Sequence, residues 1–145
     1  MEIRVLGPGD DHVLARVAVE VFDHEPLPTL TSEFLEDRRH HLVVALDDGL
    51  VVGFASGVHY VHPDKPPELW INEVGVAPSH QRRGLGHQIL RAMLRLGTEL
   101  GCREAWVLTN RSNLPAMRLY TAVGGTEAAE ETVMFTFDVD RLESS

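Results

Sequence analysis

The sequence lacks the features of secreted and membrane-spanning proteins. It has a single cysteine, Cys102, so no disulfide can form within the chain and a reducing compartment is expected. No apolar run approaches the roughly 20 residues that a membrane-spanning helix needs. The first residues do not combine a basic region with an apolar stretch, as a signal peptide does. These absences predict a cytoplasmic protein with no membrane partner.

The charged and titratable residues exclude two further kinds of partner. The 13 lysines and arginines are outnumbered by 22 aspartates and glutamates, which gives a formal net charge of −9. Nucleic-acid binding needs a basic surface, so no nucleic-acid partner is expected. The eight histidines have no acidic partner at a fixed spacing, so no metal is expected. The acidic excess could attract a cationic ligand, or it could serve only solubility.

Length and composition are those of one globular domain. With 145 residues, of which 43% are hydrophobic and 24% charged, the chain can bury a core of its own. The sequence shows no linker, repeat or low-complexity segment. We therefore expect a single domain over residues 1–145.

Hydrophobic periodicity predicts a mixed sheet with helices packed against it. Asp48-Gly49, between two β-rich runs, predicts a hairpin. An apolar stripe that starts at Leu85 predicts a long helix, and Gly101 suits its end. Strands are expected over residues 3–6, 41–46, 50–60, 69–76, 105–109 and 132–139, the last of which would close the sheet. Helices are expected over residues 10–22, 31–39, 85–100 and 113–123, with the prolines at 26 and 28 breaking the first.

The segment over residues 72–86 carries the most specific chemical signal. It leaves a buried strand, crosses a short loop and enters the long helix through Gly84 and Gly86. Backbone N–H groups at a helix start have no partner within the helix and, with the helix dipole, form an anion site. The two glycines would let phosphate oxygens approach the backbone, and Arg82 and Arg83 add positive charge. The patterns of nucleoside-triphosphate and dinucleotide loops are missing, so those ligands are not expected.

Two motifs carry a resemblance to a known family. Residues 81–86, Gln-Arg-Arg-Gly-Leu-Gly, resemble the acetyl-coenzyme A motif Gln/Arg-x-x-Gly-x-Gly/Ala of the GNAT superfamily of N-acetyltransferases. Residues 113–120 look like that superfamily's Asn-x-x-Ala-x-x-Leu-Tyr signature. The resemblance implies an α/β (α+β) fold whose mixed, mostly antiparallel sheet splays in the middle, with helices on both faces. One departure is Gly125, where the superfamily usually has a bulky apolar residue.

A narrower resemblance concerns the aminoglycoside 3-N-acetyltransferases. Short pieces similar to theirs occur in matching order over residues 21–25, 60–63, 119–121 and 134–140. This resemblance implies transfer of an acetyl group to a primary amine of a polycationic small molecule. An aminoglycoside antibiotic, acetylated at its 3-N position and so inactivated, is the specific expectation.

The superfamily resemblance implies acetyl-coenzyme A as co-substrate and a place for each of its parts. Backbone groups of the strand before the loop would pair with the pantetheine arm, in an opening between the strands over residues 69–76 and 105–109. Backbone amides of the loop would hold the pyrophosphate. Asn113 would cap its helix and could also touch the coenzyme. The expected coenzyme-binding residues are Val74, Val76, Gln81, Arg82, Arg83, Gly84, Leu85, Gly86 and Asn113.

The same resemblance implies direct transfer with two catalytic side chains. Glu73, on the splayed strand, would accept the proton of the substrate amine, directly or through water. Its alternative is a carboxylate that only orients a cationic substrate or pairs with an arginine. Tyr120 would protonate the departing thiolate, and its alternative is a packing tyrosine whose hydroxyl bonds the coenzyme sulfur. The backbone N–H of Val76 could polarise the thioester carbonyl.

Acidic residues gather in the segments expected to frame the acceptor, which are the first two helices, the loop after residue 60 and the C-terminal hairpin. The expected acceptor-binding residues are Asp23, Glu25, Tyr60 and Asp138. Two other functions stay open: acetylation of a protein lysine, an N-terminal amine or a polyamine, and a non-catalytic acyl-coenzyme A-binding module. The strand that starts near Met134 could also pair across a homodimer interface.

Overall fold

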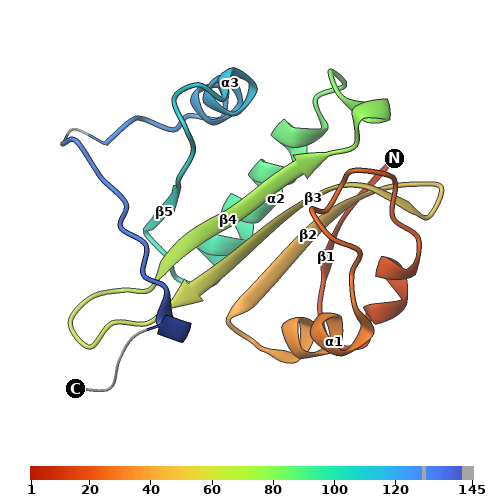
Figure 1. Ribbon diagram of the computed structural model, residues 1–145, viewed down its shortest axis with the longest axis horizontal. Helices are drawn as coiled ribbons and strands as arrows, with labels where there is room; N and C mark the ends of the chain where they lie inside the picture. The colour runs from red at the N-terminus through yellow and green to blue at the C-terminus, as the bar shows by residue number, and fades with distance from the viewer. Residues whose placement is uncertain (129, 142–145) are drawn as a thin grey trace.

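The computed structural model describes residues 1–128 and 130–141, which form a five-stranded sheet with helices on both faces (Figure 1). Within these residues the strands lie in chain order across the sheet. They are β1 (Glu2–Leu6), β2 (His40–Asp47), β3 (Leu50–Tyr60), β4 (Glu68–Val76) and β5 (Glu104–Val107). The helices are α1 (Pro28–Glu36), α2 (Leu85–Glu99) and α3 (Leu114–Ala122), with 3₁₀ turns η1 (Asp11–Ala15), η2 (Pro78–His80) and η3 (Val139–Arg141).

The sheet is mixed and mostly antiparallel, as predicted. Each pair from β1 to β4 is antiparallel, and β4 and β5 run parallel. Asp48 and Gly49 join β2 to β3 with φ angles of 50° and 80°. Asp-Gly favours this two-residue turn because positive φ at both positions matches the twist of the strands. The predicted hairpin is confirmed.

One face of the sheet is covered by α2, along the predicted apolar stripe. Ile89 and Met93 of α2 have no exposed surface. Glycines in β3 make room for them: a Cβ on Gly53 would lie 2.8 Å from Ile89 Cδ1, and one on Gly57 would lie 3.4 Å from Met93 Sδ. Full burial of such side chains stabilises the fold by about 1.5–3 kcal/mol each. The core therefore lies between α2 and the strands β2, β3 and β4.

The opposite face is covered over β2 and β3, and the chain before α1 reaches β4 at Gly75, where a Cβ would lie 3.0 Å from the Val21 carbonyl oxygen. Phe22 stacks on Phe54 of β3 with ring centroids 4.2 Å apart, and Phe34 of α1 packs edge-on against His40 of β2 at 5.1 Å. Figure 1 shows α2 behind the sheet and no helix in front of the middle of β4. We call the β4–β5 part of this side the open face.

The strands β4 and β5 separate before β4 ends. Their register runs from Glu68 opposite Glu104 to Ile71 opposite Val107. β4 nevertheless continues, paired with β3, as far as Val76. The remaining edge of β4 thus has no β5 partner, and the splay that the sequence predicts lies between the two expected strands.

The helix predicted over residues 10–22 is wrong in most of its length. Only η1, Asp11–Ala15, turns as a helix. Val17 then bridges Val51 of β3, whose N–H donates to the Arg16 carbonyl (2.9 Å) and whose carbonyl accepts from the Ala18 N–H (2.8 Å). β4 ends opposite Gly53 and does not reach Val51 of β3. The backbone groups of Arg16 and Ala18 therefore bond to Val51 instead of to other residues of a helix.

The second helix begins earlier than predicted. Pro28, expected to break a helix, is the first residue of α1, which ends at Glu36 rather than near Arg39. Proline suits a first turn because its missing N–H would have no partner there. Thr31, the first residue of the predicted helix, lies inside α1, and its N–H donates to the Leu27 carbonyl at 2.8 Å.

The strand predicted over residues 132–139 is also wrong. None of the described residues after α3 joins the sheet. Alternation of apolar and polar residues is typical of a strand, but a strand also needs a neighbouring strand to pair with. The neighbour available at this side of the sheet, β5, is only four residues long. An ion pair between Arg111 Nη1 and Glu127 Oε1 (2.8 Å) ties the chain after α3 to the loop before that helix. The apolar side chains of this segment are exposed, at Val133 (67%), Met134 (74%), Phe135 (79%), Phe137 (76%) and Val139 (73%).

Two expectations concern the chain as a whole. No helix in the described ranges is long and apolar enough to span a bilayer. A single domain over residues 1–145 stays a prediction, and residues 142–145 lie outside the described residues.

Candidate functional site

Three elements meet at the end of the β4 edge that β5 leaves free. Val76 is the last residue of β4, Gly86 lies in the first turn of α2, and Leu119 lies in α3. A Cβ on Gly86 would lie 3.3 Å from Leu119 Cδ2 and 3.9 Å from Val76 Cγ2. The strand opening, the start of α2 and the middle of α3 therefore form one site.

The loop between β4 and α2 presents backbone N–H groups to solvent. The first bond within α2 runs from the Gln88 N–H to the Gly84 carbonyl (3.2 Å), so the N–H groups of residues 85–87 have no acceptor in the helix. Arg82 and Gly84 are left-handed, with φ of 65° and 76°. Such residues turn neighbouring N–H groups to one side, as in anion-binding nests. With Arg82 and Arg83 exposed beside it, the loop is suited to bind an anion.

The two motif glycines serve different needs. A Cβ on Gly84 would meet nothing within 4 Å, so this glycine is needed for its positive φ. Gly86 faces Leu119, and a side chain there would push α3 away from α2. Close approach of a phosphate therefore stays a prediction for Gly84, whereas Gly86 has a packing role.

Gln81 and Leu85 shape the loop from within. Gln81 Nε2 donates to the Val76 carbonyl at 3.2 Å and so ties the loop to the end of β4. The Leu85 side chain is only 3% exposed and belongs to the core. Only the backbone of Leu85 can face a ligand.

A hydrogen-bonded chain fixes the loop to the β2–β3 hairpin. His80 Nε2 lies 2.7 Å from Asp47 Oδ2, and His80 Nδ1 lies 2.7 Å from Ser79 Oγ. The bond from His80 lowers the pKa of Asp47. The sequence placed His80 beside the phosphate loop but gave no sign of Asp47, which is 33 residues away and meets it only in the fold.

The start and end of α3 position Asn113 and Tyr120. Asn113 Oδ1 accepts from the Ala116 N–H at 3.2 Å, so its predicted capping role is confirmed. Tyr120 is half-buried, and burial raises the pKa of its hydroxyl, which keeps the proton in place. A Cβ on Gly125 would lie 2.9 Å from the Tyr120 carbonyl oxygen, which itself accepts from the Gly125 N–H at 2.8 Å. This contact explains why a bulky residue is absent from position 125.

Glu73 lies on the open face, beyond the last residue pair of β4 and β5. It is directly opposite Ser56, as Gly75 is opposite Phe54, and residues that face one another across strands share a side of the sheet. The Glu73 side chain is exposed. An exposed carboxylate at the strand opening is placed to contact a ligand that enters from this face.

Asp23 and Glu25 lie near the same end of β4. Both are exposed and follow Val21, whose carbonyl oxygen would lie 3.0 Å from a Cβ on Gly75. The chain before α1 thus crosses β4 close to Glu73. The acceptor-binding roles of Asp23 and Glu25, which follow this contact in the chain, stay predictions.

Tyr60, another predicted acceptor residue, lies toward the other end of β4. Tyr60 ends β3 opposite Glu68, seven residues along β4 from Gly75, which is roughly 20 Å. Asp138 is exposed just before η3. The C-terminal hairpin that was expected to help frame the acceptor does not form among the described residues, and the acceptor-binding roles of Tyr60 and Asp138 stay predictions.

Two aromatic residues that sequence reasoning missed lie on the open face. Trp70 and Trp106 are opposite one another on β4 and β5, and their rings stack with centroids 5.1 Å apart and planes at 12°. The available signal was the same three-residue pattern, aliphatic-Trp-aliphatic, in two strands predicted to be neighbours.

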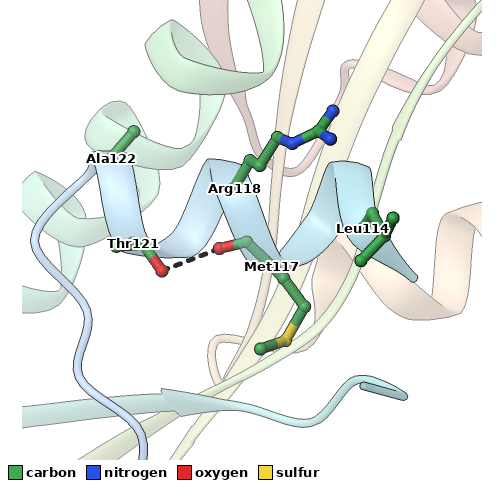
Figure 2. Close-up of a pocket in the computed structure, with 5 residues that line it drawn as sticks. All are labelled: Leu114, Met117, Arg118, Thr121 and Ala122. Carbon is green, nitrogen blue, oxygen red and sulfur yellow. Dashed lines mark hydrogen bonds between the residues drawn. The ribbon is translucent and has the colours of Figure 1, made fainter. Parts of the chain in front are cut away.

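A shallow hollow lies along α3, apart from these residues. Leu114, Met117, Arg118, Thr121 and Ala122 line it, and Figure 2 shows the Thr121 Oγ1 donating to the Met117 carbonyl at 2.8 Å. One helix supplies the whole lining, and none of the predicted site residues is included. The hollow is therefore no candidate for the reaction site.

His41 and His62 each lie close to another titratable side chain. His41 Nε2 lies 2.7 Å from His59 Nδ1, and burial, then the charge of His59, lowers the pKa of His41 to about 4. His62 Nε2 lies 2.7 Å from Glu68 Oε2. In the part of the chain that the structure describes, no group of three metal-binding side chains gathers.

Comparison with known proteins agrees with the fold. An aminoglycoside N(6′)-acetyltransferase type 1 of Salmonella typhimurium is 33% identical over 96 residues, which are 63% of this chain and 65% of that protein. A mycothiol acetyltransferase of Thermomonospora curvata is 33% identical over 142 residues, 90% of this chain but 46% of that protein. The chain thus covers less than two thirds of the length of either relative.

A solved structure and a family match complete the comparison. The aminoglycoside N-acetyltransferase AAC(6′)-Iy in complex with CoA superposes with a TM-score of 0.75 at 26% identity, over 94% of this chain and 93% of that one. Residues 11–124, which include the strand opening, the loop and α3, match the acetyltransferase (GNAT) family. This chain belongs to the acetyltransferase (GNAT) family.

Proposed function

We propose that the protein is a cytoplasmic N-acetyltransferase that moves the acetyl group of acetyl-coenzyme A to a primary amine of a polycationic small molecule, represented by an aminoglycoside. The observation that carries this proposal is the opening between β4 and β5 beside the start of α2. Here the free edge of β4 ends at a loop whose N–H groups can bind an anion, and α3, which carries Tyr120, packs against the start of α2 through Leu119.

The coenzyme would lie along this opening. Its pyrophosphate would accept bonds from the loop N–H groups between Arg82 and Gly86, and Arg83 would add charge at the rim. Its pantetheine arm would pair with the free edge of β4 at Val74 and Val76. Gln81 and Asn113 would contribute mainly by holding the loop and α3 in shape, because both side chains already have partners within the protein.

Transfer then needs two proton movements. The neutral amine attacks the thioester carbonyl, a C–N bond forms and the C–S bond breaks. Glu73 accepts the proton that the amine loses, and the Tyr120 hydroxyl gives a proton to the departing thiolate. Burial raises the pKa of Tyr120, so its hydroxyl carries the proton that this role requires. The Val76 N–H can polarise the carbonyl as charge develops on its oxygen.

The acceptor class rests on charge and on the relatives. Asp23, Glu25 and Glu73 are exposed, and the segment that leads to Asp23 and Glu25 touches β4 at Gly75, so these carboxylates would favour a substrate with several ammonium groups. Relatives named as aminoglycoside acetyltransferases support an amino sugar. Their names specify the 6′ amine, so 3-N acetylation stays a prediction from the short sequence resemblances alone.

The test is a thiol-release assay with acetyl-coenzyme A and a panel of amines. We expect release with gentamicin, together with the mass gain of one acetyl group, and little release with a lysine peptide. NMR of the product decides between the 3-N and 6′ positions. Acetylation of the peptide alone would replace this proposal with protein modification. Coenzyme binding without thiol release on any amine would favour a non-catalytic module.

Substitutions at the two catalytic positions should separate chemistry from binding. Glu73→Gln should lower kcat by roughly 10²-fold, because general-base catalysis contributes about that much. Tyr120→Phe should also lower kcat more than it raises the KM of acetyl-coenzyme A. A Glu73→Gln enzyme with unchanged kcat and a higher acceptor KM would make Glu73 a binding residue only.

The loop assignment can be tested with two matched glycines. Gly84 precedes α2 with φ 76° and Gly101 follows it with φ 87°, and neither has a neighbour for an added Cβ. Alanine at either position should cost about 1–2 kcal/mol of stability through the left-handed strain alone. Only Gly84→Ala should weaken acetyl-coenzyme A binding several-fold in calorimetry. Equal affinities for both variants would remove the loop from the coenzyme site.

A second copy of this chain is the proposed partner of the C-terminal segment. Soluble monomers rarely expose large apolar patches, and five of the seven residues over 133–139 are exposed large apolar side chains. β5 forms a sheet edge to which none of the described residues pairs on its outer side. Another copy supplies both the missing edge and an identical segment, so a two-fold arrangement would satisfy both chains.

Light scattering after size-exclusion chromatography tests this dimer. The wild type should have the mass of two chains, and the double variant Phe135→Asp, Phe137→Asp should have the mass of one. Val19→Asp is the matched control, because Val19 is an apolar residue 82% exposed elsewhere in the chain, and it should stay dimeric. A wild type of single-chain mass at micromolar concentration would contradict the proposal.

A further inference from the structure

The only two tryptophans of the chain form one stacked pair. Trp70 and Trp106 occupy matching positions on β4 and β5, with ring centroids 5.1 Å apart and planes within 12° of parallel. They occupy the last but one pair before the strands separate. The pair therefore borders the opening in which the reaction is proposed to occur.

The pair points away from α2. Leu69, the neighbour of Trp70, has no exposed surface and faces α2, where a Cβ on Gly97 would lie 3.0 Å from Leu69 Cδ2. Successive residues of a strand point to opposite faces, so Trp70 points to the open face. Trp106, opposite Trp70 in the register, shares that face.

A strand irregularity brings Glu73 to the same face. β3 pairs Gly57 with Ile71 and Ser56 with Glu73, so Asn72 is an extra residue on β4. This bulge puts Trp70 and Glu73 on one side of the sheet although they are three residues apart. Trp70 and Glu73 are about 10 Å apart along the strand. A substrate ring that lies against the indoles could therefore place one of its amines at the Glu73 carboxylate.

The tryptophans are not required to fill the core. Trp70 is 37% exposed, whereas the buried side chains of β4, Leu69 and Ile71, lie on the α2 side. Flat, partly exposed indoles offer a surface that attracts cations and the apolar faces of sugar rings. This chemistry matches an amino sugar, which has ring C–H groups and ammonium groups together.

We propose that Trp70 and Trp106 form the acceptor platform: an amino-sugar ring lies against the indoles while its reacting amine is held at Glu73. This proposal rests on the function proposed above and adds to it the residues that select the acceptor. An indole surface would favour a protonated sugar ring over a flexible polyamine, because a polyamine has charge but no ring face to stack.

Intrinsic fluorescence tests the platform directly, because every tryptophan of the chain belongs to it. Gentamicin added to the wild type without acetyl-coenzyme A should change the emission saturably. Spermidine should have a weaker effect at equal charge, and a neutral disaccharide should have none. In Trp70→Phe and Trp106→Phe, the one remaining tryptophan should still respond. An unchanged emission at saturating gentamicin would overturn the proposal.

Kinetics of substituted enzymes give the second readout. Trp70→Leu should raise the KM of the acceptor roughly tenfold, the value of one partly desolvated cation–π contact, and leave the KM of acetyl-coenzyme A unchanged. Trp70→Phe keeps an aromatic face and should restore most of the acceptor affinity. Circular dichroism of each variant checks the fold.

The outcomes distinguish this platform from the reaction itself. If gentamicin is acetylated and Trp70→Leu keeps the wild-type acceptor KM, the platform is wrong and the transferase stands. If gentamicin changes the emission but no amine in the panel is acetylated, the binding site stands and the transferase is wrong. If neither is observed, both proposals are wrong.

Discussion

Backbone pairing between β4 and β5 stops after Ile71 and Val107, although β4 continues to Val76. Polar backbone groups inside a protein are costly unless they find partners. A strand edge left free at the centre of the molecule therefore creates a place for a ligand with amide groups of its own. The start of α2 lies at the end of this edge, and α3 is held against it through Leu119. The loop before α2, Tyr120 and Glu73 are therefore all arranged around the point where β4–β5 pairing ends.

Much of the fold could be predicted because local rules determine it. Asp48-Gly49 allows few backbone shapes other than the turn it makes. The apolar stripe of α2 leaves one way to cover the sheet, and Gly101 adopts the left-handed conformation expected after the helix. The parts of the candidate site that lie on these elements, from Glu73 to Gly86 and from Asn113 to Tyr120, were therefore found from the sequence.

The remaining parts depend on which strand edges stay free, and periodicity does not contain that information. Residues 10–22 have a helical pattern, but the edge of β3 at Val51 recruits Val17 and its neighbours into backbone pairing. Residues 132–139 alternate as a strand does, but they form no strand of the sheet. The stacking of Trp70 on Trp106 required knowledge of the parallel register. Each case depends on contacts between residues far apart in the sequence, and local propensities and short motifs do not report such contacts.

The hydrogen bond between Asp47 and His80 means that the loop motif cannot be transferred to another protein on its own. A segment over residues 76–88 moved into another scaffold would carry the glycines, the arginines and the contact from Gln81 to Val76. It would leave behind the hairpin carboxylate that holds His80, and with it the orientation of the turn before Arg82. Engineers who exchange this loop between relatives would need to exchange the end of β2 with it. The functional unit is thus larger than the motif, and it is discontinuous in the sequence.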